Sequence, residues 1–247
     1  MARIPVSERK MPPSSYLQSV PAYAGQRELA WPVSDMVEDI IADARAAGFA
    51  SPYFNVISGF RTYAQQERLF NQAVQKYGSV AEARKWVAPP GKSAHNTGYT
   101  IDFYLGGPTN SSAVAQIQRD PAFRYMRDVI APKYGLSPYA REPWHWECDK
   151  SCRATYIMRK YGVDGELARQ IVDEEIIVPQ GDMVAFLESR TEDGEGEGET
   201  QVTRDDGKTE VTRNTDSKVG KTLLALSLVG GTSFGIWLWL KQRNENN

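Results

Sequence analysis

Apolar residues recur at helical spacing over several stretches of the chain. The clearest stripe begins after Asp35, where Asp35 and Glu38 have the spacing of a capping box, and it ends at Gly48. A helix that packs one face against a core is expected there. The same spacing predicts further helices over 62–77, 79–86, 111–131 and 153–190.

Shorter runs show the two-residue period of strands. Residues 99–105 alternate, so Asp102 is expected on the face opposite to Ile101 and Phe103. Residues 142–147 predict an edge strand, because Pro143 cannot donate to a strand ladder. Helices and strands intermix without a βαβ repeat. We therefore expect an α+β fold, with a small antiparallel sheet flanked by helices.

Changes in composition divide the chain into parts. The first 33 residues are rich in Pro, Ser and Tyr without a period, which predicts an arm that is either extended on the domain or partly disordered. Beyond residue 190, acidic residues alternate with glycines and large apolar residues become rare, as in a flexible linker. The expected parts are the arm (1–33), a main domain (34–152), a helical extension (153–190), the linker (191–218) and a C-terminal segment (219–241).

The C-terminal segment predicts a transmembrane helix. Thr222 to Leu240 contains no charged residue and would form a helix of about 28 Å, close to the thickness of a bilayer core. Tryptophans and basic residues near its end fit an interfacial anchor. Gly231 and Gly235 form a G-x-x-x-G pair, which is compatible with a homodimer through this helix. A buried core helix is the alternative.

Composition and charge fit one globular domain with appendages. Hydrophobic residues make up 41% and charged residues 24% of the 247. Residues 1–190 carry 22 basic and 21 acidic residues, net +1, and residues 191–247 carry 7 and 10, net −3. Neither part predicts nucleic-acid binding. Two cysteines, Cys148 and Cys152, are too few for a disulfide framework, and whether they pair is left open.

The chain has two histidines, and each lies in a short polar motif. His95 belongs to a segment from Ser93 to Asp102, and His145 closes the run that begins at Glu142. A hydrolytic zinc site needs about three N or O ligands, an open position for water and a carboxylate base. We therefore expect His95, Asp102 and His145 to bind Zn²⁺ at the open face of the sheet. Glu142 would act as the general base.

Two steps in this assignment depend on local geometry. Gly98 permits a tight turn between His95 and Asp102 if its backbone takes a positive φ. Glu142 and His145 are three residues apart, and strict strand alternation would place them on opposite faces. The assignment therefore requires Pro143 to distort the strand.

These motifs resemble a known family. The patterns S-x-H-x-x-G-x-x-x-D and E-P-W-H, preceded by residues 58–62 (S-G-F-R-T) and Gln65, are similar to those of the VanY-type D-alanyl-D-alanine carboxypeptidases. The superfamily also contains phage L-alanyl-D-glutamate endolysins. The resemblance covers roughly residues 34–150. Thr100 stands where the family usually has alanine.

The resemblance implies a zinc-dependent peptidase that acts on bacterial peptidoglycan. It assigns the zinc ligands and the base to the residues named above, and substrate contact to Arg61. Arg61 would hold a substrate carboxylate or a developing oxyanion, with a surface salt bridge as the alternative. Ser93 and Gln65 are expected to bind substrate, with loop capping as their alternative role.

Rival interpretations of the motifs are weaker. A structural Cys2His2 zinc site from both histidines, Cys148 and Cys152 would lack the compact spacing of zinc fingers and would leave Glu142 unused. A phosphate-binding loop ending at residues 91–93 would require glycine where Trp86 stands. The alternative function is a non-catalytic wall-binding or virion structural protein that keeps the zinc site.

The expected topology affects the function. The first residues contain no apolar stretch of the kind that signal peptides have, so a tail anchor with the main domain in the cytoplasm is expected. Residues 204–221 hold five basic residues, which agrees with that orientation. Because peptidoglycan lies outside the membrane, we interpret the chain as a bacteriophage lytic enzyme, single-pass in a viral membrane or the host inner membrane.

Overall fold

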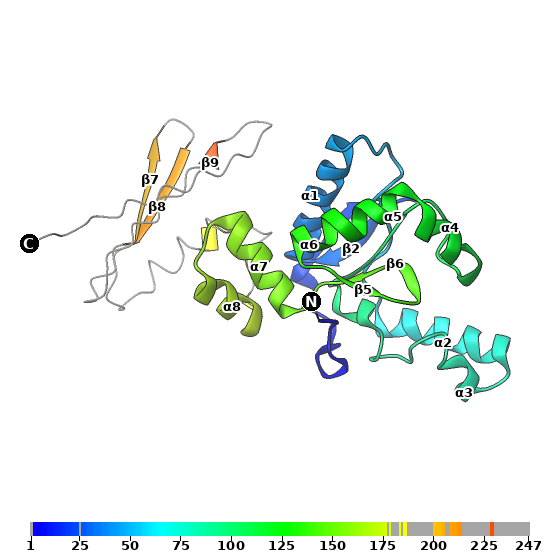
Figure 1. The fold of residues 1–247 in the computed structure, drawn as a ribbon. Coiled ribbons are helices and arrows are strands. Elements are labelled where there is room, and N and C mark those ends of the chain that lie inside the picture. Colours follow the sequence, from blue (N-terminus) through cyan, green and yellow to red (C-terminus); the bar gives the residue numbers. More distant parts are fainter. Residues whose placement is uncertain are drawn as a thin grey trace, which may run out of the picture. The chain divides into compact units, whose positions relative to one another are not determined.

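A computed structural model describes residues 2–24, 26–176, 178, 183, 185–186, 200–205, 208–213 and 228–229. The chain forms two compact units, Met1–Gly181 and Asp182–Asn247. The first unit contains all the residues of the candidate site, and its four-stranded sheet positions them (Figure 1).

The first 33 residues are more ordered than the expected extended arm. After two short 3-10 helices, η1 (Val6–Glu8) and η2 (Ser14–Tyr16), strand β1 (Leu17–Pro21) pairs antiparallel with β2 (Gln26–Ala30). Leu29 is fully buried in the main core. Burial of apolar side chains thus fixes a hairpin that the irregular composition did not reveal.

The main sheet is antiparallel, with strand order β3-β4-β6-β5. The prediction that residues 142–147 form an edge strand is wrong, because β6 lies between β4 and β5. The register between β5 and β6 is irregular next to Pro143, so that the strand tolerates a residue without an N–H. The strands are β3 (Val56–Ser58), β4 (Thr100–Phe103), β5 (Ser137–Tyr139) and β6 (Glu142–Glu147).

The helices before the first motif begin at or near the expected positions. Helix α1 starts two residues earlier than the Asp35 signal indicates, because Val33 is fully buried and extends the apolar face. Thr62 and Gln65 form a capping box at the start of the next helix. The helices are α1 (Val33–Ala46), α2 (Tyr63–Tyr77), α3 (Val80–Ala83) and the 3-10 helix η3 (Ala94–Thr97).

The single helix expected over 111–131 is a series of short ones. Asp120 has an extended backbone, as a residue before proline prefers, and it caps the helix that Pro121 begins. The series is η4 (Ser111–Ala113), α4 (Val114–Arg119), α5 (Pro121–Tyr125), the π-helical turn η5 (Met126–Ile130) and α6 (Ala131–Tyr134).

The core lies on one face of the sheet. Ile101 and Phe103 on β4 are fully buried there, together with residues of α1 and of the helices from α4 to α6 (Figure 1). The alternation expected for residues 99–105 is thereby confirmed for β4. Asp102 consequently lies on the opposite face, which is left for the polar residues of the site.

Two helices follow the sheet. Helix α7 (Lys150–Tyr161) packs on α8 (Gly165–Asp173) and begins before the boundary expected at residue 152. Cys148 and Cys152 form a disulfide, which ties the end of β6 to the first turn of α7. Most of the expected helical extension beyond residue 176 lies outside the described residues.

The second unit contains strands where a flexible linker was expected. Strand β7 (Thr200–Asp205) pairs antiparallel with β8 (Lys208–Arg213). The sequence signal for this hairpin is the alternation of Val and Thr around Asp206-Gly207, a pair that two-residue turns favour.

The expected transmembrane helix over 219–241 lies outside the described residues, apart from strand β9 (Leu228–Val229), which pairs with β8. Among the described residues, no helix is long and apolar enough to cross a bilayer.

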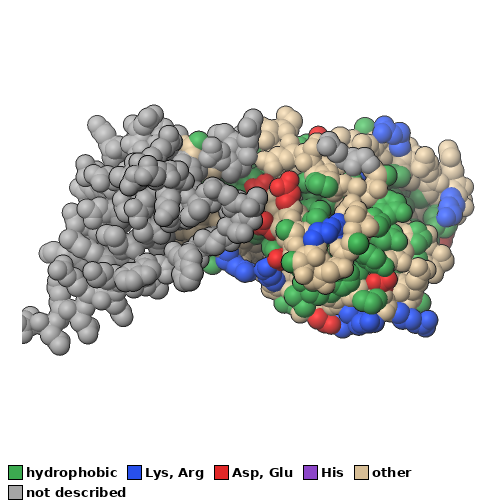
Figure 2. Space-filling view, turned by 90° about the horizontal axis from the view of Figure 1, so that it is seen from above, with side chains coloured by type: hydrophobic (Ala, Val, Ile, Leu, Met, Phe, Trp, Pro, Cys, Tyr) green, Lys and Arg blue, Asp and Glu red, His purple; other side chains and the backbone are tan. Residues whose placement is uncertain are grey.

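On the first unit, the face in Figure 2 carries acidic, basic and apolar side chains interspersed, without a continuous patch of one charge among its coloured residues.

Candidate metal centre

One face of the sheet carries a row of polar residues across three strands. Ser58 on β3 pairs with Asp102 on β4, and Asp102 pairs with His145 on β6. Residues directly opposite each other on neighbouring strands point to the same face. The pairing alone therefore brings one carboxylate and one imidazole together on the side away from the core.

The second imidazole enters from the loop before β4. Helix η3 carries His95 and ends at Gly98, whose φ is 72°. A Cβ on Gly98 would lie 2.8 Å from that of Ala30, so both the positive φ and the close approach require glycine. The ring of His95 is fixed by the backbone, because its Nδ1 lies 2.8 Å from the carbonyl oxygen of Gly59. Its Nε2 then faces Asp102 Oδ2 at 3.3 Å.

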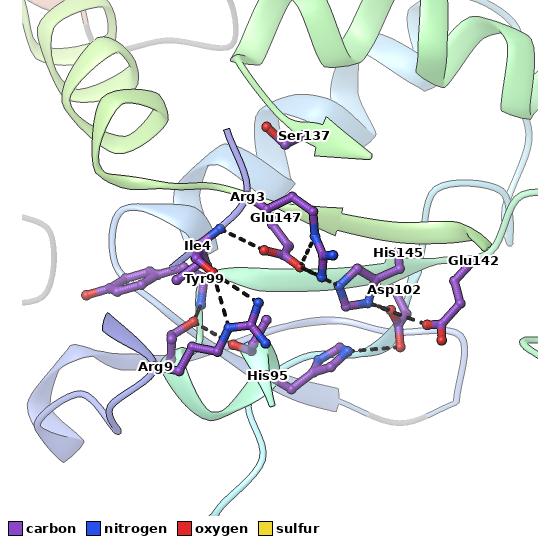
Figure 3. Close-up of polar contacts among 12 residues, drawn as sticks. Arg3, Ile4, Arg9, His95, Tyr99, Asp102, Ser137, Glu142, His145 and Glu147 are labelled. Carbon is purple, nitrogen blue, oxygen red and sulfur yellow. Dashed lines mark hydrogen bonds and ion pairs between the residues drawn. The ribbon is translucent and has the colours of Figure 1, made fainter. Parts of the chain in front are cut away.

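His145 completes the cluster from the other side of Asp102. Its Nδ1 lies 3.0 Å from Asp102 Oδ1, and its Nε2 lies 3.2 Å from Glu147 Oε1 (Figure 3). One ligand atom from each of His95, Asp102 and His145 lies within 4.8 Å of the others.

Two imidazole nitrogens and one carboxylate oxygen are a donor set suited to Zn²⁺. Ligand atoms on a tetrahedron around zinc lie about 3.4 Å apart, because each is about 2.1 Å from the ion. The separations of 3.0 and 3.3 Å between Asp102 and the two histidines are close to that value. The three residues that the sequence predicts as ligands are thus brought together, and they can hold a metal ion.

The charges at the cluster are strongly coupled. Burial alone would raise the pKa of Asp102. The charges and hydrogen bonds of both histidines have the larger effect and hold that pKa well below its usual range. Burial lowers the pKa of His95. Burial also opposes charge on His145, yet hydrogen bonds to Asp102 and Glu147 raise its pKa to about 9. In the metal-free protein, His145 therefore carries the proton that a metal ion would displace.

Glu142 lies beside this cluster, as the proposed base requires. Its Oε2 is 3.8 Å from His145 Nδ1, and its side chain is 36% exposed, so water can reach it. The irregular register provides the distortion that was expected of Pro143. Tyr139 pairs with Glu142, but the preceding residue of β5 pairs with Trp146, so three residues of β6 bulge between them. Burial raises the pKa of Glu142.

Arg61 also reaches the site. Its Nη2 lies 3.7 Å from Asp102 Oδ2 and 3.0 Å from Ser58 Oγ, and its Nη1 donates to Gln66 Oε1 at 3.1 Å. Burial lowers the pKa of Arg61, and the negative charge of Asp102 opposes this change. The guanidinium thus lies at the edge of the cluster, held in place by neutral side chains.

The two residues expected to bind substrate lie in different settings. Gln65 is exposed, and its Oε1 accepts from Thr62 N in the capping box, which is the alternative role considered for it. Ser93 is buried immediately before η3. Substrate binding by either residue remains a prediction.

Two residues near the site were missed by sequence reasoning. Gln66 is 1% exposed and links Arg61 to the carbonyl oxygen of Ala88. Glu147 accepts from His145, and the two-residue period of β6 could have placed both on one face.

The structure also decides between the rival metal sites. Because Cys148 and Cys152 are joined, their sulfurs are not the thiolates that a Cys2His2 site needs.

Thr100, where the family usually has alanine, lies on β4 opposite Glu147. Its hydroxyl is fully buried and has no hydrogen-bond partner among the described residues.

Comparisons with known proteins identify a family for the domain that contains this site. Residues 26–148 match the family model of VanY, D-alanyl-D-alanine carboxypeptidase. The chain is 29% identical over 125 residues to a D-alanyl-D-alanine carboxypeptidase of Enterococcus faecalis, with 46% of each chain covered. It is 33% identical over 98 residues to YodJ, a candidate carboxypeptidase of Bacillus subtilis, with 36% of each covered. The chain thus spans less than half the length of these relatives.

Solved structures that match the chain include the LdcB LD-carboxypeptidase, at 21% identity and a TM-score of 0.47, covering 72% of this chain and 80% of that one. A vancomycin-resistance D,D-pentapeptidase VanY in complex with Zn(II) is 22% identical, with a TM-score of 0.39, covering 68% of this chain and 97% of that one. By its sequence match over residues 26–148, this domain belongs to the VanY family of D-alanyl-D-alanine carboxypeptidases.

Proposed function

We propose that the VanY-family domain is a zinc-dependent peptidase that hydrolyses stem peptides of bacterial peptidoglycan. The observation that carries the proposal is the convergence of His95, Asp102 and His145 with Glu142 only 3.8 Å from His145. A purely structural metal site has no use for a partly exposed carboxylate beside its ligands. The family and the curated relatives support peptide hydrolysis as the reaction.

The side chains of the site have separate roles in this reaction. Bound Zn²⁺ would supply Lewis acidity to a water molecule and to the substrate carbonyl. Glu142 accepts a proton from water as the water oxygen bonds to the carbonyl carbon, and its raised pKa makes it a better base. The same carboxyl then delivers the proton to the leaving amine as the C–N bond breaks.

Arg61 provides a fixed positive charge beside the cluster. Ser58 and Gln66 hold its guanidinium 3.7 Å from Asp102, one of the candidate metal ligands. A charge of this kind binds the terminal carboxylate of a peptide, or stabilises an oxyanion. Binding of a terminal carboxylate by Arg61 would favour a carboxypeptidase. Stabilisation of an oxyanion by Arg61 is also compatible with an endopeptidase.

Mass spectrometry of purified muropeptides, incubated with the full chain, tests the proposal. We expect products that disappear when a zinc chelator is added and return when Zn²⁺ is restored. Loss of one terminal alanine would identify a carboxypeptidase, and cleavage within the stem would identify an endopeptidase. Absence of product from every muropeptide would contradict the proposal and favour a wall-binding or structural protein.

We further propose that the chain is a phage lytic enzyme anchored in a membrane by residues 219–241. The uncharged stretch from Thr222 to Leu240 supports this. Flotation with lipid vesicles tests the anchor, because the full chain is expected to float and a chain ending at residue 218 to stay in the lower fraction. Equal behaviour of both chains would contradict it.

A further inference from the structure

Glu147 is a buried carboxylate that the proposed reaction does not use. Its side chain is 0% exposed, and its Oε1 lies 3.2 Å from Nε2 of the ligand His145. A buried carboxylate is unfavourable unless charged or polar partners compensate for its lost hydration. Its partners come from the beginning of the chain, 144 residues away.

A segment near the N-terminus, residues 2–9, supplies these partners, and we refer to it as the N-terminal strap. Arg3 donates to Glu147 Oε1 from Nε at 2.8 Å and from Nη2 at 2.5 Å. The backbone N–H of Ile4 donates to the other oxygen, Oε2, at 2.8 Å (Figure 3). Both oxygens of Glu147 are therefore occupied by donors from this strap.

We propose that Arg3, Ile4 and Glu147 are positioning residues for the metal centre, which fix the ring of His145 so that its Nδ1 faces Asp102. The proposal rests on the proposed function, because it assigns a role toward the metal of that site. Arg3 and Ile4 lie outside the family match, which covers residues 26–148, whereas Glu147 lies within it.

The hydrogen-bond directions give the physical reason. An ionised carboxylate only accepts, so Glu147 requires a proton on His145 Nε2. A neutral imidazole has one N–H, and its other nitrogen, Nδ1, then keeps its lone pair for a metal ion. Partners of this kind orient the ring and raise its basicity as a ligand. The two hydrogen bonds from Arg3 keep the Glu147 carboxylate ionised and hold it in the orientation that accepts from His145 Nε2.

The strap is itself anchored to β5, the strand beside β6, and to the segment just before His95. Ser137 on β5 donates to the carbonyl oxygen of Ala2 at 2.8 Å. Arg9 donates to the carbonyl oxygen of Ile4 at 3.0 Å and to that of Lys92, three residues before His95, at 2.7 Å. Ile4 is 4% exposed, and the guanidinium of Arg3 lies 4.1 Å from the centre of the Tyr139 ring. The position of the strap is thus defined by several contacts.

A purely structural role would be a simple tether of the chain end. Arg3 is 41% exposed, but its partner Glu147 is fully buried, so loss of Arg3 should lower the free energy of unfolding in either role. The two roles differ in their effect on the metal. A tether affects stability alone, whereas a positioning residue also affects metal affinity and ligand geometry in the folded protein.

The test compares the full chain with four variants, Arg3→Gln, Arg3→Lys, Glu147→Gln and Arg127→Gln. Arg127 is the matched control, because it makes an equally close two-contact ion pair with Asp128, at 2.6 and 2.7 Å, away from the site. Zinc affinity is measured by competition with a chromophoric chelator, and ligand geometry by the visible absorption of bound Co²⁺. Thermal unfolding of the metal-free proteins reports stability.

We expect Arg3→Gln and Glu147→Gln to weaken zinc binding by about 10- to 100-fold and to shift the Co²⁺ spectrum. Arg3→Lys should recover part of the affinity, and Arg127→Gln should match the unchanged chain. Affinities of the Arg3 and Glu147 variants within about twofold of the control would overturn the proposal. Should Arg3→Gln not fold, unchanged affinity and spectrum in Arg3→Lys would overturn it.

These readouts do not depend on peptide cleavage. Zinc affinity that depends on Arg3 and Glu147, in a chain that cleaves no muropeptide, would refute the proposed function and leave this inference in place. Cleavage with zinc affinity insensitive to Arg3 and Glu147 would refute the inference alone.

Discussion

His95 and His145 meet at the same carboxylate, Asp102, but different parts of the molecule hold their outer nitrogens. The Nδ1 of His95 is fixed by the backbone carbonyl of Gly59. The Nε2 of His145 is fixed by a side chain, Glu147, which depends in turn on Arg3. The contact that fixes His95 comes from the backbone and depends on no side chain, whereas the contact that fixes His145 can be altered by substitution at Glu147 or Arg3.

Because of this difference, substitutions around His95 and around His145 should affect metal affinity differently. A Cβ on Gly59 would lie 2.5 Å from the carbonyl oxygen of Glu28, so the chain there cannot shift without disturbing β2. The His145 side consists of contacts between segments far apart in sequence. Metal affinity is therefore expected to vary mainly through the His145 side.

The largest effect should come from removing either ligand itself. His95→Gln and His145→Gln should each reduce zinc affinity by more than about 100-fold. Loss of a ligand's hydrogen-bond partner typically costs up to about 100-fold, and loss of the ligand itself should cost more. The measurement is competition with a chelator, with circular dichroism as the check on folding. Zinc affinity retained in either variant would break the assignment of that histidine.

Glu142→Gln should reduce peptide hydrolysis without reducing zinc binding. Because Glu142 is the proposed base and not a ligand, hydrolysis should fall by about 10²- to 10⁴-fold while zinc remains bound. The rate of muropeptide cleavage and the zinc content of the purified variant check this. Full activity with zinc bound would exclude Glu142 as the base.

The pH dependence of zinc binding should report His145. Its raised pKa, about 9, means that a metal ion must displace a proton below that pH. Zinc affinity should therefore rise about tenfold per pH unit between pH ~6.5 and ~9 and then level off. Affinity independent of pH over this range would contradict the protonated His145.

The same proton affects stability with a defined sign. A raised folded-state pKa means that the folded protein binds the proton more tightly than the unfolded chain does. This contribution is complete below pH ~6.5, the ordinary histidine value, and is lost as the pH rises through about 9. The His145 contribution alone therefore predicts that metal-free protein loses stability over that interval, which thermal unfolding can check.

Reduction of the Cys148–Cys152 disulfide, which follows β6, should have a moderate effect on stability. The bond closes a loop with a sequence separation of four, and loss of so small a loop should cost about 2 kcal/mol of unfolding free energy. Denaturant unfolding with and without reductant measures it. Zinc affinity should stay unchanged in the folded state, and a large loss would show that the disulfide positions His145.

The smallest effect is expected from Thr100→Val. The Thr100 hydroxyl is buried without a partner among the described residues, and valine replaces it by an apolar group of similar shape. The free energy of unfolding should stay equal or rise by up to about 1 kcal/mol, as measured by denaturant titration. A clear loss of stability would show that the hydroxyl has a polar partner.

The parts of the fold with local signals could be predicted from the sequence. Alternation over residues 99–105 placed Asp102 opposite the core. The helix predicted over 79–86 matches α3 at its start, where Ser79 is the cap. The short helices after residue 111 were missed as separate elements, because the break before Pro121 interrupts an otherwise helical pattern.

The parts that depend on tertiary pairing could not be predicted. The approach of Glu142 to His145 follows from the irregular pairing of β5 with β6, which no local pattern specifies. The Arg3–Glu147 contact joins residues 144 positions apart, and each is an ordinary charged residue in its own segment. The candidate metal ligands could be predicted because both histidines lie in motifs that resemble those of the family, whereas the residues that support them lie partly outside these motifs.

X-ray absorption at the zinc edge of the zinc-loaded full chain tests the central claim most directly. The convergence of His95, Asp102 and His145 predicts two imidazole nitrogens and additional oxygen ligands at about 2.0–2.2 Å, with no sulfur. A sulfur ligand at about 2.3 Å, or a first shell of oxygen alone, would contradict it.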